Sequence, residues 1–164
     1  MKSQDPPIEL LQPIVNLFTN GKLQQALSDT NQLLKKFPNS VILCNISGAS
    51  NSGLMQFNEA IVSYKKALEI KPDHAEAYYN MGIALKNKND LEAAIDSYKK
   101  ALEIKPDYVE AYFNIGNILK SKNDLEAAIV SYKKALEIKP DHAEAYYNMG
   151  IALKDTGDLE AAID

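Results

Sequence analysis

Asparagines at a fixed spacing are the side chains of this sequence whose pattern has the clearest chemical meaning. Asn80, Asn114 and Asn148 follow one another at intervals of 34 residues. A side-chain amide carries both donors and acceptors of hydrogen bonds, so it can pair with an extended peptide backbone in two places. The spacing therefore predicts a row of amides that could hold a peptide, provided that the fold brings them onto one face.

Side chains that commonly catalyse reactions or bind metals are present but do not cluster. His74 and His142 lie two periods apart, whereas a metal site needs three or four converging ligands. Cys44 has no histidine at helical spacing that could activate it, so we interpret it as a small core residue. The sequence also lacks a phosphate-binding loop and a dinucleotide fingerprint. It predicts a protein that is not an enzyme and that needs no cofactor or metal.

The composition narrows the choice of partner. The net charge is −4, and all 18 basic residues are lysine. Arginine is the residue that recognises phosphate and guanine in two places at once, so an acidic chain without arginine is not expected to bind nucleic acid. We find no apolar run of the roughly 18 residues that would span a membrane, and no secretory leader pattern near the N-terminus. The expected compartment is the cytoplasm, with no membrane partner.

The asparagine spacing is the period of an internal repeat. Residues 71–86 recur unchanged at 139–154, with a near copy at 105–120. A fixed period of this length indicates an array in which each unit is too small to bury its own apolar face and must stack on its neighbours. We expect one array over residues 1–164, in five units of which the first is divergent and the last incomplete: 3–36, 37–70, 71–104, 105–138 and 139–164.

Each unit is expected to contain two helices, here called helix A and helix B. In the unit 71–104, Asp73 and Glu76 form a capping-box pattern, and helix A then runs to about Asn87. Asn89 is expected to adopt the left-handed conformation that ends a helix. Helix B starts at about Asp90. Apolar residues at helical spacing and small residues that allow close approach of the helices mark their contact: Tyr78, Met81, Leu85, Gly82, Ala94 and Ala101.

The first two units depart from this pattern. Pro13 falls inside the first expected helix, which should therefore either bend or begin near Gln12. In the second unit, residues that should be large and apolar are small or polar, and Met55 replaces the asparagine of the turn. We expect the N-terminal third to be the least regular and least stable part. The three replaced core positions are Cys44, Ser47 and Asn51.

These residues resemble the tetratricopeptide repeat, from about Phe37 to the C-terminus. The family has an aromatic residue and then Leu-Gly in helix A, an alanine, an aromatic residue and an alanine in helix B, and a closing proline. The resemblance implies an all-α fold, a right-handed superhelical α-solenoid of antiparallel helix pairs. In the unit 71–104 the matching residues are Tyr78, Met81, Gly82, Ala94, Tyr98, Ala101 and Pro106.

The resemblance also implies where a partner would bind. In this family helix A lines the inner face, and the asparagine row looks like the ladder with which O-linked N-acetylglucosamine transferase grips peptide backbones. Two alternatives stay open: the asparagines cap or solvate the groove, and the aromatic residues pack between neighbouring A helices. The expected groove comprises Glu76, Tyr79, Asn80, Ile83, Lys86, Phe113, Asn114, Asn117, Lys120, Tyr147, Asn148, Ile151 and Lys154.

The leading hypothesis is a non-catalytic scaffold for protein-protein interaction that binds an extended peptide in a concave groove. The sequence does not identify the peptide. A second hypothesis follows from the end of the sequence within an expected helix B, which suggests a substrate-docking arm cut from a larger glycosyltransferase- or sulfotransferase-like enzyme. A third is self-assembly into a homo-oligomer by end-to-end stacking, through an exposed edge formed by Leu159, Ala162 and Ile163.

Overall fold

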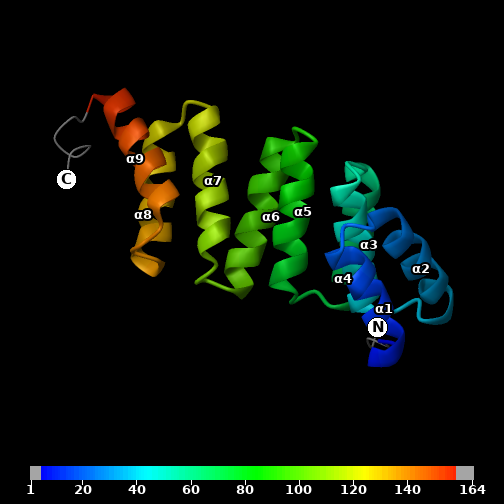
Figure 1. Cartoon of the computed structure of the whole chain (residues 1–164). Helices are drawn as coiled ribbons and strands as arrows, with labels where there is room; N and C mark the ends of the chain where they lie inside the picture. The colour runs from blue at the N-terminus through cyan, green and yellow to red at the C-terminus, as the bar shows by residue number, and fades with distance from the viewer. Residues whose placement is uncertain (1–4, 158–164) are drawn as a thin grey trace. The chain divides into compact units, whose positions relative to one another are not determined.

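A computed structural model describes residues 5–157 (Figure 1). This part of the chain contains α-helices and no strand, which confirms the all-α prediction. None of its helices is long and apolar enough to cross a membrane. The helices are α1 (Ile8–Thr19), α2 (Leu23–Lys36), α3 (Val41–Gly53), α4 (Phe57–Ile70), α5 (Ala75–Asn87), α6 (Leu91–Ile104), α7 (Val109–Ser121), α8 (Leu125–Ile138) and α9 (Ala143–Thr156).

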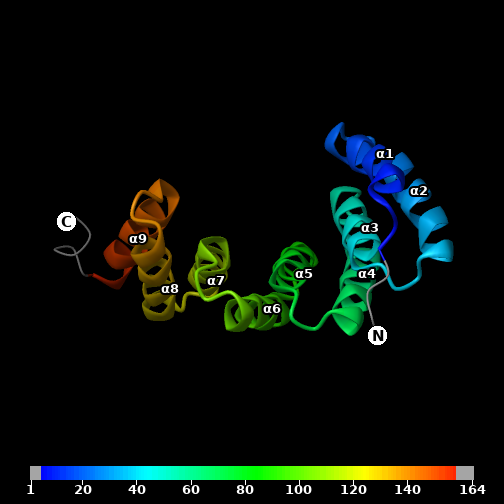
Figure 2. The same ribbon diagram turned by 90° about the horizontal axis from the view of Figure 1, so that it is seen from below.

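The chain packs as two compact units, with the boundary between Ser97 and Tyr98 inside α6. In the first unit α3 packs on both α2 and α4, and α4 also packs on α5. In the second unit α8 packs on both α7 and α9 (Figure 2). Helices that follow one another in the sequence are thus neighbours in space within each unit. The division into five units, the last of them incomplete, stays a prediction from the sequence. The proposed self-association edge of Leu159, Ala162 and Ile163 lies outside the described residues.

Helices α3 and α7 approach the next helix through a glycine. A Cβ atom on Gly48 would lie 2.5 Å from Cε1 of Tyr64, and one on Gly116 would lie 2.6 Å from Cε1 of Tyr132. Real Cβ atoms essentially never come this close to another heavy atom, so only glycine fits at these two places. Both tyrosine rings are fully buried. The recurring glycine therefore sets how closely the two helices of a pair approach.

The turn that follows the first helix of each pair uses a left-handed residue. Asn89 has φ 68° and Asn123 has φ 62°, which confirms the expectation for this turn. Met55 occupies the corresponding turn between α3 and α4 and has φ 60°. It is 76% exposed, so packing of its side chain does not explain this conformation. Because a side chain with a Cβ is disfavoured in this conformation, Met55 is a strained residue.

One expectation about a helix end is wrong, and one of two alternatives for another helix end is excluded. The residue that caps α5 is His74, without a side-chain hydrogen bond, so Asp73 lies one position too early to form the capping box with Glu76. Helix α1 begins at Ile8 and continues through Pro13, so it does not start near Gln12. Pro13 is exposed, and water can reach the Glu9 carbonyl that loses its helical partner.

The second helix pair is well buried in spite of its unusual composition. Cys44 is 1% exposed, Ser47 4% and Asn51 5%, so these residues occupy core positions of α3. Hydrogen bonds join the polar ones: the Ser47 and Ser63 hydroxyls lie 3.1 Å apart, and Asn51 Nδ2 lies 3.5 Å from Ser47 Oγ. Polar contacts thus replace apolar packing here, and the lower stability expected for this region stays a prediction.

The strained turn leads to a prediction about stability. Met55→Gly should raise the free energy of unfolding by about 1 kcal/mol, because glycine adopts the left-handed conformation without steric cost. Chemical denaturation followed by circular dichroism would measure the change. Met55→Ala is the matched control, since it shortens the side chain but retains the Cβ. Equal stability of the glycine and alanine variants would contradict the strain.

The glycine contact leads to a second prediction. Gly116→Ala should lower the free energy of unfolding by about 1–3 kcal/mol, because the new methyl group collides with the Tyr132 ring. The same measurement on a Tyr132→Leu background provides the control. If the ring causes the collision, the alanine should cost less there. An equal cost in both backgrounds would show that the glycine is needed for another reason.

Candidate functional site

The residues expected to line a groove lie on three helices. Helix α5 carries Glu76, Tyr79, Asn80, Ile83 and Lys86 in the first unit. The others lie in the second unit: α7 carries Phe113, Asn114, Asn117 and Lys120, and α9 carries Tyr147, Asn148, Ile151 and Lys154.

Asn148 is the member of the asparagine row whose surroundings the structure defines best. Its Nδ2 donates to Oδ1 of Asn117 at 3.1 Å, and its Oδ1 accepts from Nζ of Lys120 at 2.6 Å. Both partners lie on α7, so these bonds tie α9 to α7 and fix the orientation of the amide. An amide has two N–H donors and two acceptor lone pairs. Asn148 therefore retains one donor and one acceptor for a ligand.

The same network reaches the buried core through Tyr132. Its hydroxyl donates to Oδ1 of Asn117 at 2.8 Å, so Asn117 accepts from two side chains. Burial raises the pKa of Tyr132 to about 12, so the hydroxyl remains protonated near neutral pH and able to donate. The tyrosine that sets the helix spacing thus also positions the polar residues that hold Asn148.

Asn114 is arranged differently from Asn148. Its Nδ2 donates to the Glu110 carbonyl of its own helix at 2.9 Å, and its side chain is half-buried. Asn80, on α5, is also half-buried. The asparagines of the row thus share a sequence position, but Asn114 and Asn148 differ in their hydrogen bonds.

The aromatic residues of the expected groove on α7 and α9 differ in how far they are buried. The Phe113 ring packs on the ring of His142, with 4.9 Å between centroids, and lies 6.0 Å from that of Tyr132. Phe113 therefore packs against α8 and the N-cap of α9, while its expected contact with a partner stays a prediction. Tyr147 is 72% exposed and Tyr146 is 51% exposed. Of the expected aromatic residues on α7 and α9, Tyr147 is the one accessible to a partner.

Two histidines contribute to these helix contacts in a way that the sequence analysis missed. His142 is the N-cap of α9, where its Nδ1 accepts from the Ala145 amide at 3.4 Å, and its ring packs on Phe113. In the first unit, Nε2 of His74 lies 3.1 Å from Nδ2 of Asn45. Both contacts join residues 29 positions apart, Asn45 to His74 and Phe113 to His142. In the sequence, the shared separation of 29 residues was the signal that could have revealed these two contacts.

No three His, Cys, Asp or Glu side chains within residues 5–157 lie together in a way that could hold a metal ion. Burial raises the pKa of the Cys44 thiol, which keeps it protonated and weakly reactive at neutral pH. Within the described part of the second unit, Asn148 can hydrogen-bond a polar ligand and Tyr147 can contact apolar groups.

Comparison with known proteins supports the fold and the repeat. A family model described as TPR repeat matches residues 56–89, 84–120 and 116–157, and one described as Tetratricopeptide repeat matches residues 15–40. Among solved structures, MamA aligns with a TM-score of 0.85 and 30% identity over 90% of this chain and 86% of that chain. YrrB, described as a TPR protein with an unusual peptide-binding site, aligns with a TM-score of 0.78 over 96% of this chain and 81% of that chain. Its identity of 22% supports the fold alone.

Curated relatives match over a smaller part of their length. The peroxisomal targeting signal receptor of Candida glabrata is 30% identical over 87 residues, which are 53% of this chain and 15% of that protein. The probable UDP-N-acetylglucosamine–peptide N-acetylglucosaminyltransferase SEC of Arabidopsis thaliana is 39% identical over 78 residues, which are 48% of this chain and 8% of that protein. The matched family models cover more than half of the sequence, and this chain therefore belongs to the tetratricopeptide repeat family.

Proposed function

We propose that this chain is a protein-interaction scaffold that binds an extended peptide segment of a partner along its A helices and catalyses no reaction itself. The observation that carries the proposal is the fixed amide of Asn148, which Lys120 and Asn117 orient and which retains a donor and an acceptor. An amide held in place before binding loses little conformational entropy when a ligand arrives, which favours affinity.

In the proposed complex the peptide backbone pairs with Asn148 through one N–H and one carbonyl. The exposed ring of Tyr147, one residue earlier on α9, contacts a neighbouring side chain of the peptide. Asn80 and Asn114 are proposed to act similarly, each on its own helix. Backbone pairing of this kind depends little on the peptide sequence, so we expect broad specificity.

Similar proteins support this proposal. YrrB is described as having an unusual peptide-binding site, and the Candida glabrata relative is named as a receptor for a targeting signal. Both descriptions concern recognition of polypeptide segments by proteins to which this chain is similar. The structural basis in this chain remains the Asn148 network.

A second candidate function is a substrate-docking arm of a larger enzyme. It is favoured by the similarity to the Arabidopsis glycosyltransferase, which is 39% identical over 78 residues. The open reading frame that encodes this chain decides between the two: a catalytic domain in the same frame supports the docking arm, and its absence contradicts it. Stacking of copies through Leu159, Ala162 and Ile163 stays a third prediction, which analytical ultracentrifugation over a range of concentrations would test.

The peptide hypothesis predicts a specific loss of affinity. Peptides selected from a random library on the wild-type protein should bind Asn148→Ala roughly 10-fold more weakly, because two hydrogen bonds of about 0.5–1.5 kcal/mol each are lost. Fluorescence anisotropy with labelled peptides would measure the dissociation constants. Asn114→Ala should also weaken binding of peptides long enough to reach it.

Two further variants make this experiment decisive. Lys120→Met keeps the Asn148 amide but removes the group that orients it, so affinity should fall by less than in Asn148→Ala. Asn20→Ala, at an exposed position at the end of α1, removes an unrelated amide and should bind as the wild type does. Unchanged affinity of Asn148→Ala, with circular dichroism showing an intact fold, would exclude the asparagine from the mechanism.

A further inference from the structure

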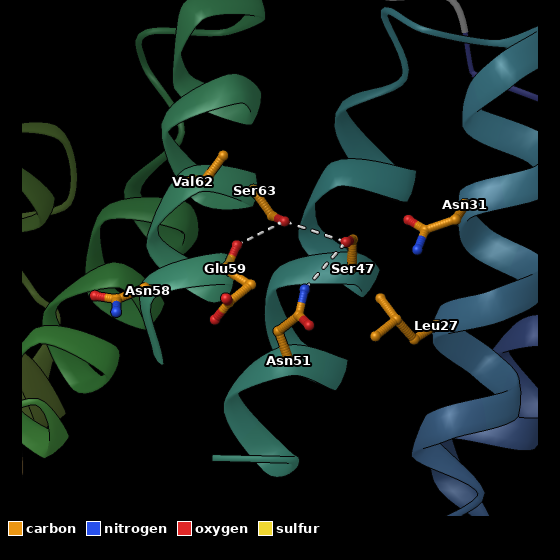
Figure 3. Close-up of a pocket in the computed structure, with 8 residues that line it drawn as sticks. All are labelled: Leu27, Asn31, Ser47, Asn51, Asn58, Glu59, Val62 and Ser63. Carbon is orange, nitrogen blue, oxygen red and sulfur yellow. Dashed lines mark hydrogen bonds between the residues drawn. The ribbon is translucent and has the colours of Figure 1, made fainter. Parts of the chain in front are cut away.

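A pocket in the first unit has a chemistry that neither the repeat nor the proposed peptide site requires. It lies between α2, α3 and α4 and has a volume of about 360 Å³ (Figure 3). Pockets of this size hold small ligands or single side chains of a partner. Its walls include the apolar residues Leu27 and Val62, and its polar residues are Asn31, Ser47, Asn51, Asn58, Glu59 and Ser63.

The next pocket along the chain shows which residues the following repeat places at three of these positions. It lies between α4, α5 and α6 and is lined by Met81, Leu85 and Ala93 among others. These three residues follow Ser47, Asn51 and Glu59 by one period of 34 residues. Apolar residues thus occupy all three positions in the next pocket, although the rest of its lining includes charged residues such as Asp90 and Asp96. The first pocket differs from it by carrying polar residues at these three positions.

For each hydrogen bond among the pocket residues, the donor and the acceptor can be assigned. The Ser63 hydroxyl donates its proton to the Glu59 carbonyl at 3.0 Å. Ser63 therefore accepts in its 3.1 Å contact with Ser47, and Ser47 is the donor. Asn51 in turn donates from Nδ2 to Ser47 Oγ at a longer 3.5 Å. Both hydroxyl protons are thus used within the protein, as Figure 3 shows by the dashed lines between these residues.

The groups left to a ligand include acceptors on α3 and α4, besides the amides of Asn31 and Asn58. Oδ1 of Asn51 remains as an acceptor on a side chain that is 5% exposed. Glu59 is the acidic residue among those that line the pocket. Leu27 and Val62 supply an apolar wall beside these acceptors. A ligand that matches this arrangement has several donors, a positive charge and an aliphatic portion.

We propose that this pocket binds a primary ammonium group on an aliphatic stem. An ammonium has three donors and no acceptor, and it complements the Asn51 oxygen and the Glu59 carboxylate. The stem packs on Leu27 and Val62 while the charged end makes the polar contacts, as lysine side chains commonly do. A lysine of a partner protein and a small free alkylamine share this chemistry. The site is independent of the peptide site proposed on the A helices.

The test uses n-butylamine as the probe and 1-butanol as a neutral control of the same length. In the full chain, n-butylamine should cause saturable NMR shift changes of the Asn51 side-chain amide and the Val62 methyl groups. The response to 1-butanol should be at least about 10-fold weaker, because it lacks the charge and two of the donors. Equal responses to the two compounds would overturn the proposal.

Substitution of pocket residues by those of the next repeat tests whether the binding occurs in the pocket. Ser47→Met combined with Asn51→Leu installs two apolar residues of the following pocket, and Glu59→Ala installs the third. Binding followed at Val62 should weaken roughly 10-fold or more in each. Glu69→Ala removes the same charge from α4 outside the pocket and should leave binding unchanged. Undiminished binding in Glu59→Ala, which changes an exposed residue and should fold, would contradict the site.

Peptides distinguish the two sources of the ammonium group. A short peptide with a central lysine and the same peptide with that lysine acetylated would be titrated in the same way. Shift changes at Asn51 with the unacetylated peptide, but not with the acetylated one, support a lysine side chain of a partner as the occupant. Binding of n-butylamine without binding of the lysine peptide supports a small free amine. Binding of neither compound overturns the proposal.

Discussion

Contact between a glycine of one helix and a tyrosine ring of the next is the constraint on which the helix pairs depend. At Gly48 and Gly116 any larger residue would collide with Tyr64 or Tyr132. The two helices of a pair can therefore approach this closely only where the first helix carries a glycine. Burial of the ring stabilises the pair, and in the second unit the tyrosine hydroxyl reaches Asn117. Packing of the core and orientation of the surface amides are thus coupled through one residue.

The second helix pair shows how much chemical variation this packing tolerates. Ser47 and Asn51 replace the methionine and leucine of the following unit, yet both are more than nine-tenths buried. Ser47 and Asn51 are each hydrogen-bonded within the pair, which offsets part of the cost of their burial, whereas the buried Ser50 Oγ on the same helix lacks a hydrogen-bond partner. The result is a helix pair of ordinary geometry that carries a polar pocket on its surface.

Two different kinds of recognition can therefore coexist on this small array. The Asn148 network presents an oriented amide with a donor and an acceptor, which suits a peptide backbone. The pocket between α2, α3 and α4 presents acceptors beside apolar residues, which suits an ammonium group on a stem. In both proposals a departure from simple apolar stacking, and not the fold itself, specifies the ligand.

The sequence by itself determined the all-α class, the membership of the repeat family and the left-handed turn at Asn89, because periodicity and turn chemistry are local properties of the chain. It was misleading where neighbouring residues compete, as at the Asp73 cap, and it left open whether the first helix bends at Pro13 or begins near Gln12. Only the tertiary structure decided that Lys120 holds Asn148 and that Phe113 packs on His142. These partners lie 28 and 29 residues apart, and their contacts depend on how one helix pair packs on the next.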